Sequence, residues 1–252
     1  MIKLVVSDLD GTLLKQEETE ICKPIKKRLR LLLDKGVKIA VASGRDYAEL
    51  APFFRDFKDE IYFISADGAY YSHKGNSLYE RKIDMSDLSD AIKQCPGAPL
   101  VLRGKSLSYA LGNPPKSELY RDTEFISHLN EIPKTEKIFK LIKFSAPLRL
   151  SKDSGLRLHW DGRSLGHFEY VSRYANKGAA LSDLQNRLML SPLDTAAIGD
   201  GPNDIPLFRG AKIKISVGDR CPELKSLATR EAICGIGALS IILDEVSQGE
   251  KA

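Results

Sequence analysis

Residues 2–11, IKLVVSDLDG, decide the fold of this chain. Ile2 to Val6 is a short apolar run that predicts a buried β-strand. Asp8 and Asp10 come at the end of this run, and Gly11 marks a turn after them. Two carboxylates at the mouth of an apolar strand are costly unless a cation compensates them, so they predict a site. The alternative is structural, with one aspartate capping a helix and the other in a turn.

Strands and helices alternate in the sequence that follows. Residues 24–34 have apolar side chains at helical spacing, and residues 37–42 (VKIAVA) predict a second buried strand. Residues 47–57 predict another helix, and residues 61–64 predict a third strand. Such alternation at short spacing is typical of parallel strands joined by crossover helices. We therefore expect an α/β domain built on a parallel sheet.

A different pattern begins after about Tyr79, where short strands grouped as hairpins predict antiparallel pairing. The elements predicted there are helices over residues 87–95 and 117–129 and strands over residues 100–103, 107–111, 138–144, 156–160 and 167–171. The first pattern returns with a helix over residues 177–188. We predict a core domain of residues 1–80 and 175–252, interrupted by an inserted α+β domain of residues 81–174.

Polar side chains also follow the other predicted strands of the core. Ser43 comes directly after VKIAVA, and Asp200 comes after the run TAAIG. Lys177 opens a helix, and Asp204 follows Asp200 by four residues. Because the carboxyl ends of parallel strands share one edge, where ligands bind, these groups can converge with the aspartates of the first strand. Carboxylates with one lysine and one hydroxyl suit Mg²⁺ and a phosphate group, since Mg²⁺ prefers oxygen ligands.

At these residues the chain resembles the haloacid dehalogenase (HAD) hydrolases. DLDGTL at residues 8–13, ASGR at 42–45, NKG at 176–178 and GDGPND at 199–204 are similar to the four ordered motifs of that family. The insert falls between the second and third motifs, as in the type IIB, or Cof-like, subgroup. The resemblance implies a Rossmann-like α/β core with a parallel sheet and an inserted α+β cap of type C2B.

The resemblance also implies a phosphatase that uses Mg²⁺. In that family pattern Asp8 is the nucleophile, Asp10 is the general acid and base, and Lys177 stabilises negative charge. The residues implied to bind phosphate or substrate are Thr12, Ser43, Gly44, Arg45 and Asn203. The implied metal ligands are Asp8, Asp200 and the backbone carbonyl of Asp10, and Asp204 holds Lys177 or metal-bound water.

Two positions leave alternatives open. Arg45 either contacts substrate or the cap, or forms a structural ion pair. The segment Asp67-Gly68-Ala69 departs from the NGA that Cof-like proteins often have, since Asp67 replaces the Asn. The Asp places a carboxylate near an anionic substrate. One role that fits Asp67 is hydrogen bonding to a sugar hydroxyl.

Asp10 favours phosphatase or phosphomutase chemistry, because dehalogenases of this superfamily do not need an acid and base there. The function expected first is hydrolysis of a small phosphorylated metabolite, with a sugar phosphate as the preferred class, through an aspartyl-phosphate. The alternatives are a phosphomutase of the phosphomannomutase kind and a non-catalytic module that binds a phosphate ligand. The mutase would need a second phosphate pocket, for which the insert shows no clear basic cluster.

Composition sets the remaining expectations. The formal net charge of +4, from 38 basic and 34 acidic residues, is too small to indicate a nucleic-acid partner. The four cysteines lack the spacing of a zinc site. No apolar run reaches the roughly 20 residues that a membrane span needs, and the N-terminus does not resemble a signal peptide. We therefore expect a cytoplasmic enzyme with no membrane partner, and the oligomeric state stays open.

Overall fold

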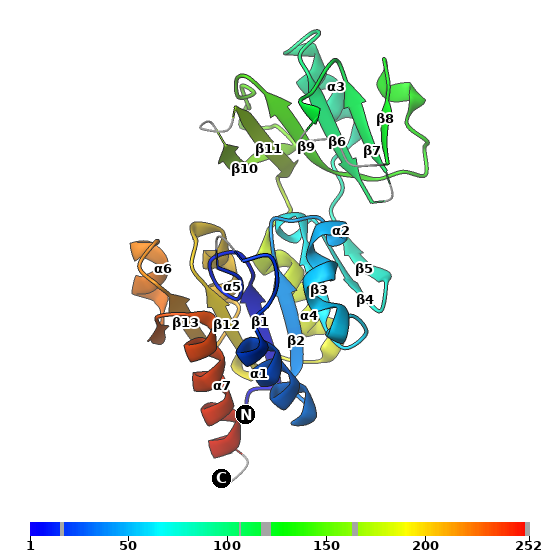
Figure 1. Cartoon of the computed structure of the whole chain (residues 1–252). Coiled ribbons are helices and arrows are strands. Elements are labelled where there is room, and N and C mark those ends of the chain that lie inside the picture. The colour runs from blue at the N-terminus through cyan, green and yellow to red at the C-terminus, as the bar shows by residue number, and fades with distance from the viewer. Residues whose placement is uncertain (16–17, 106, 117–121, 163–165, 250–252) are drawn as a thin grey trace. The chain divides into compact units, whose positions relative to one another are not determined.

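The computed structural model describes residues 1–15, 18–105, 107–116, 122–162 and 166–249 (Figure 1). The chain divides into two compact units. The first unit, the core, comprises Met1–Glu80 and Asn176–Ala252, and the second, the inserted unit, comprises Arg81–Ala175. Within the described residues, no helix has the length and apolar character that crossing a membrane requires.

An eight-stranded sheet, ordered β14-β13-β12-β1-β2-β3-β4-β5, forms the middle of the core. The strands from β14 to β3 are parallel, and β4 and β5 continue the sheet in antiparallel pairing. The strands are β1 (Leu4–Asp8), β2 (Lys38–Ala42), β3 (Tyr62–Ser65), β4 (Tyr70–His73), β5 (Asn76–Glu80), β12 (Thr195–Gly199), β13 (Ile213–Val217) and β14 (Arg230–Ala232). The parallel sheet predicted from the alternating pattern is confirmed.

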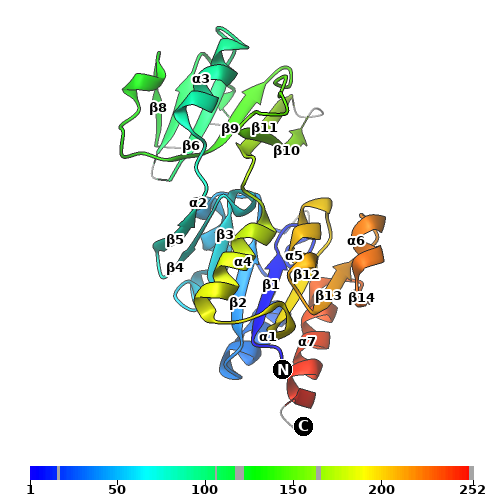
Figure 2. The ribbon, with the colours of Figure 1, turned by 180° about the vertical axis from the view of Figure 1, so that it is seen from behind.

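Helices cover both faces of the core sheet, as Figures 1 and 2 show from opposite sides. The helices are α1 (Lys23–Asp34), α2 (Tyr47–Leu50), α4 (Lys177–Leu188), α5 (Ile205–Arg209), α6 (Pro222–Leu227) and α7 (Gly235–Gly249). Val5 of β1 packs with apolar residues of α1 and α7, whereas Leu4 and Val6 pack with those of α4 and α5. Since neighbouring side chains on a strand point to opposite faces, a strand covered on both faces must be apolar throughout.

The predicted helix over residues 47–57 is only partly correct. The regular α-helix ends at Leu50, and Ala51–Phe57 continues as a 3₁₀ segment. Phe54 has φ −119° and ψ 33°, which is outside the helical region. Pro52 lacks a backbone N–H and clashes with the preceding turn, which explains why the regular helix stops here.

The inserted unit is a six-stranded sheet, ordered β10-β11-β9-β6-β7-β8, with a helix on one face. Its elements are α3 (Met85–Lys93), β6 (Leu100–Gly104), β7 (Ser108–Leu111), β8 (Thr123–Phe125), β9 (Ile138–Phe144), β10 (Leu156–Gly162) and β11 (His167–Ser172). All pairs are antiparallel except β7 with β8. Leu88 of α3 packs against Leu102, Leu141 and Tyr170 from three of the strands. The expected α+β insert in an α/β core is confirmed.

The helix predicted over residues 117–129 is wrong where the structure describes that segment. Residues 117–121 lie outside the described residues, and Thr123–Phe125 form the edge strand β8. The backbone of β8 pairs in parallel with Ser108 to Ala110 of β7. Pairing with a neighbouring strand therefore outweighs the local preference on which the prediction depended.

Candidate functional site

The candidate site lies where three neighbouring strands of the core end. β1 pairs with both β12 and β2, so the three carboxyl ends are adjacent (Figure 1). Asp8 is the last residue of β1, Asp200 directly follows β12, and Ser43 directly follows β2. All three side chains are buried. The structure thus brings together the three strand-end residues that the sequence indicated.

Lys177 is fully buried and joins two of the carboxylates. Its Nζ donates to Asp8 Oδ1 at 2.6 Å and to Asp204 Oδ1 at 2.7 Å. It is the first residue of α4, whose N-cap Asn176 accepts a hydrogen bond from the N–H of Ala179. Because α4 begins at this point, the lysine side chain is fixed at the carboxyl edge of the sheet.

Asp204 has a structural role that its two oxygens define. Oδ1 accepts from Lys177, and Oδ2 accepts from the backbone N–H groups of Asp200 and Gly201, each at 3.1 Å. Both oxygens therefore hold other parts of the site in place. This geometry supports the alternative in which Asp204 holds Lys177.

Asp8 differs from Asp204 because one of its oxygens is unsatisfied. Oδ1 pairs with Lys177, whereas Oδ2 is buried and has no hydrogen-bond partner among the described residues. A buried carboxylate oxygen without a partner is unfavourable, so its presence at a strand end points to function. It is available both to a cation and to a substrate.

Negative charge exceeds positive charge in this part of the core. Burial raises the pKa of Asp8 well above its ordinary range against the opposing effect of Lys177, and Asp204 and Asp200 add to the rise. Burial alone would lower the pKa of Lys177, but Asp204, Asp8 and Asp67 outweigh it and raise that pKa. The lysine is therefore held charged among the buried carboxylates of Asp8, Asp200 and Asp204.

The donor set fits a divalent cation. Oxygens of Asp8, Asp200 and Asp204 lie within 4.8 Å of one another, and all three residues are buried. Oxygen-only ligands at this density are typical of Mg²⁺ sites. Gly11 makes the arrangement possible, because a Cβ at its position would lie 2.4 Å from Asp200 Oδ2. The side chain of Asp10 is not a member of this cluster; a ligand role for its backbone carbonyl stays a prediction.

Asp10 is partly exposed, with 46% of its side chain accessible, and pairs with Arg45. Arg45 donates through Nη2 at 2.6 Å and through Nε at 2.9 Å and 3.1 Å, and Ser43 Oγ donates at 3.2 Å. The guanidinium also lies over the ring of Phe53, 5.1 Å from its centroid. The ion pair that the sequence left open for Arg45 is thus formed, with Asp10 as its partner.

The remaining predicted residues lie around this cluster. Thr12 Oγ1 donates to Asp200 Oδ1 at 3.3 Å, and Asn203 Nδ2 donates to Asp67 Oδ1 at 3.3 Å. Gly44 follows Ser43 in the loop after β2. Phosphate contacts by Thr12, Ser43, Gly44, Arg45 and Asn203 stay predictions.

Two further residues lie in this region: Asp67, whose role the sequence left open, and Arg220, which was not predicted as a site residue. Asp67 is buried, has φ 53° and ψ 37°, and contacts Asn203. Arg220 donates from Nη1 to Asp200 Oδ2 at 3.0 Å. Arg220 comes three residues after the end of β13. Its place after a strand of the same sheet is the signal by which it could have been found.

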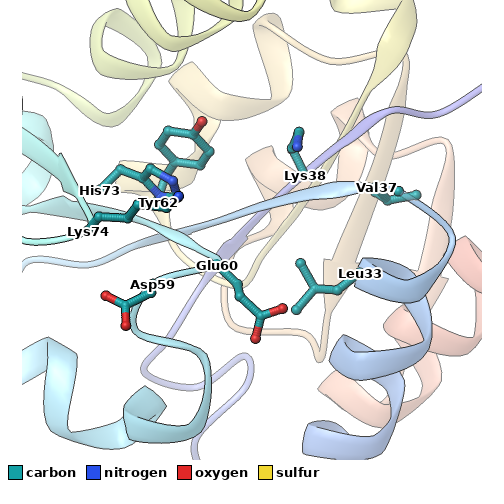
Figure 3. Close-up of a pocket in the computed structure, with 9 residues that line it drawn as sticks. Leu33, Val37, Lys38, Asp59, Glu60, Tyr62, His73 and Lys74 are labelled. Atoms are coloured by element: carbon teal, nitrogen blue, oxygen red, sulfur yellow. The ribbon is translucent and has the colours of Figure 1, made fainter.

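A separate pocket of about 220 Å³ lies at the opposite edge of the core sheet (Figure 3). Its lining includes Lys38, the first residue of β2, and Tyr62, the first residue of β3. The ring of Tyr62 stacks on His73 with 4.2 Å between the centroids. Ligands of open α/β sheets bind at the carboxyl ends of strands, so the pocket at the amino ends is not the candidate site.

Known proteins similar to this one match it over most of its length. A family model described as haloacid dehalogenase-like hydrolase matches residues 5–233. Phosphoglycolate phosphatase 1 of Saccharolobus solfataricus is 30% identical over 233 residues, which cover 90% of this chain and 88% of that protein. The 5-amino-6-(5-phospho-D-ribitylamino)uracil phosphatase YbjI of Escherichia coli is 22% identical over 227 residues and 83% of each chain.

The fold of a solved structure agrees with these matches. The HAD subclass IIB sugar phosphatase BT4131 superimposes with a TM-score of 0.73. The match covers 96% of this chain and 98% of that one at 18% identity, so the two chains have similar folds.

Proposed function

The chain belongs to the haloacid dehalogenase-like hydrolase family, and we propose that it is a Mg²⁺-dependent phosphatase in which Asp8 takes the phosphoryl group from a small phosphate monoester. One observation carries the proposal. Asp8 presents a buried oxygen without a partner at the carboxyl end of β1, while Lys177 holds its other oxygen. A carboxylate held in this way can form the covalent intermediate that divides hydrolysis into two easier steps.

In the first step an Asp8 oxygen forms a bond to phosphorus, and the bond from phosphorus to the ester oxygen breaks. Asp10 gives its proton to the leaving alcohol. In the second step Asp10 takes a proton from water, whose oxygen attacks phosphorus and releases inorganic phosphate and free Asp8. Asp10 suits this exchange because it is partly exposed and lies two residues after the nucleophile.

Lys177 keeps its charge in the buried site and lies 2.6 Å from Asp8, so it can stabilise the negative charge that phosphoryl transfer redistributes. The carboxylates of Asp8 and Asp200 and the carbonyl of Asp10 would hold Mg²⁺. When bound, the ion supplies charge neutralisation and orients a phosphate oxygen. Arg45 has the bidentate geometry that suits a phosphate group as well as a carboxylate.

The substrate proposed is a small phosphorylated metabolite. The relatives above are named for phosphoglycolate and for a phosphorylated ribitylamino pyrimidine, both small phosphate monoesters. A sugar phosphate stays the first class to test, and the structural relative BT4131 is named a sugar phosphatase. We propose that residues 81–174 act as the cap that selects among such substrates.

Phosphate release from a panel of substrates tests the proposal. The panel holds sugar phosphates, 2-phosphoglycolate, nucleotides and p-nitrophenyl phosphate, each with Mg²⁺ and with EDTA. The expected result is release that needs Mg²⁺ and that Asp8→Asn lowers at least about a thousandfold. Asp56→Asn is the matched control, since Asp56 is exposed at the surface, where it pairs with Lys26.

Other outcomes would change the function assigned. Transfer of phosphate between positions of one sugar, dependent on a bisphosphate activator, would identify a phosphomutase. Binding of phosphate esters by a folded, Mg²⁺-loaded protein without any release would identify a non-catalytic binding module.

A further inference from the structure

Arg220 is an exposed cation that pairs with a buried carboxylate of the candidate site. Its side chain is 76% exposed, whereas that of Asp200 is 5% exposed, and the two form an ion pair at 3.0 Å. Arg220 comes from the loop after β13, where Gly218 turns the chain with φ 64°. β13 lies directly beside β12, the strand that ends before Asp200. The loop after β13 thus places the positive charge of an exposed residue, Arg220, beside the buried Asp200.

The two cations of the site serve different carboxylates. Lys177 is fully buried and donates to Asp8 and Asp204. Arg220 donates to Asp200, whose other oxygen accepts a long hydrogen bond from Thr12 at 3.3 Å. Arg220 is therefore the cation that pairs directly with the Asp200 carboxylate.

The exposure of Arg220 makes its charge removable. A buried carboxylate without compensation is costly, so Asp200 needs another cation when no metal is bound. An arginine that is mostly in solvent gains little from one ion pair, so little stabilisation is lost when the pair breaks. Asp200 is also one of the two carboxylates, with Asp8, that would hold the divalent cation of the proposed function.

We propose that Arg220 is a built-in counter-ion for the metal-free site, and that a divalent cation displaces it from Asp200. This inference rests on the Mg²⁺ site of the proposed function. Metal binding is then an exchange of one cation for another. The ion pair between Arg220 and Asp200 stabilises the protein when no metal is bound. Because the metal has to displace Arg220, the site binds metal more weakly than a site with an unpaired Asp200 would.

Calorimetric titration of the full chain with Mg²⁺, and electron paramagnetic resonance of free Mn²⁺, measure this directly. Arg220→Ala is expected to tighten the divalent dissociation constant by about two- to tenfold, because the competing charge is gone. Arg220→Lys keeps a competing charge and is expected to stay nearer to wild type. Lys225→Ala is the control: Lys225 pairs with Asp219 and Glu231, and its removal is expected to change the constant little.

Unfolding with and without metal separates this role from a merely structural one. In EDTA, Arg220→Ala is expected to lower the melting temperature relative to wild type, and saturating Mg²⁺ is expected to abolish the difference. An unchanged or weaker divalent affinity in Arg220→Ala, or an equal loss of stability with and without Mg²⁺, would overturn the inference. Absence of divalent binding by wild type would instead overturn the metal site itself, and the inference with it.

Discussion

Asp10 and Asp8 are chemically identical side chains two residues apart, but their surroundings differ. Asp8 is buried and held by Lys177, whereas Asp10 reaches solvent and pairs with Arg45. In the proposed mechanism the buried residue attacks phosphorus, and the exposed one exchanges protons with water and with the leaving group. The difference arises because β1 ends between them: Asp8 belongs to the strand, and Asp10 lies in the turn after it.

Replacing Asp10 by Asn tests this division of roles. Loss of an acid and base group costs about 10²- to 10⁴-fold in rate for alkyl phosphates. The loss is expected to be smaller for p-nitrophenyl phosphate, whose leaving group needs no proton. Steady-state rates on both substrates check this, and an equal loss on both would contradict the role of Asp10 as the acid that protonates the leaving group.

Asp67 adds a negative charge next to a site that has to accept an anion. It contributes to the raised pKa of Lys177 and accepts a hydrogen bond from Asn203. Asp67→Asn removes the charge, and Asn tolerates the left-handed conformation. We expect KM for p-nitrophenyl phosphate to fall by roughly two- to fivefold, since less repulsion remains. Asp67→Ala is the comparison, and a raised KM in Asp67→Asn would show that the carboxylate itself binds substrate.

Gly68 determines where helix α4 begins relative to the turn after β3. Its φ is 85°, and a Cβ there would lie 2.2 Å from the carbonyl oxygen of Asn176 and 2.7 Å from the N of Lys177. A side chain at this position would have to move the first residue of α4. That residue is Lys177, so the close packing of Gly68 against the start of α4 also fixes the position of the site's lysine.

Gly68→Ala is therefore expected to destabilise the protein by roughly 2 to 4 kcal/mol, from backbone strain and overlap together. Gly75→Ala is the matched control, because Gly75 has φ 74° but open space around its Cβ direction. Strain alone is expected there, about 1 to 2 kcal/mol. Chemical denaturation of both variants measures the difference, and equal losses would show that the contact with α4 has no importance.

Glu169 of β11 is an acid of the inserted unit whose pKa is strongly lowered by its neighbours. Burial opposes its ionisation, but Lys140 at 3.1 Å and His167 lower its pKa from the ordinary 4.5 to about 2. Because the folded protein binds this proton less readily than the unfolded chain, the stabilisation is present above about 4.5 and is lost as pH falls toward about 2. The shift corresponds to roughly 3 kcal/mol.

Glu169→Gln is expected to cost that stability near neutral pH and little near pH ~2. Urea unfolding of wild type and variant at both pH values gives the two differences. Glu60→Gln serves as the control, since Glu60 pairs with Arg30 at the surface and is expected to change stability by less than about 1 kcal/mol. A difference for Glu169→Gln that does not depend on pH would contradict the ion pair.

Sequence patterns predicted the elements whose burial is regular. β1 is apolar from Leu4 to Val6 and β2 from Ile39 to Ala42, with the expected Asp8 at the end of β1 and Ser43 directly after β2. The segment over residues 123–125 was wrongly predicted, because its strand depends on pairing with β7. Arg220 was not predicted as a site residue, and the partner of Asp67 was not predicted, since only the arrangement of neighbouring loops brings the two residues to Asp200 and Asn203.

The core unit is continuous in space although its sequence is interrupted by the insert. Residues from before and after the insert share the same apolar clusters on both sheet faces, while the inserted unit has a cluster of its own. Glu80 pairs opposite Tyr70, which pairs opposite Ser65 at the end of β3. The core therefore stops before the insert and resumes after it, at Asn176, on the sheet edge that carries the site. Loops at that edge can carry function while the core gives rigidity.

Rapid quenching of the wild-type chain during turnover of a ³²P-labelled substrate tests most directly whether Asp8 accepts the phosphoryl group. We expect label on the protein that survives acid, is released by hydroxylamine and is absent from Asp8→Asn. Turnover in wild type without such label, or the same label in Asp8→Asn, would contradict the assignment of Asp8 as the nucleophile.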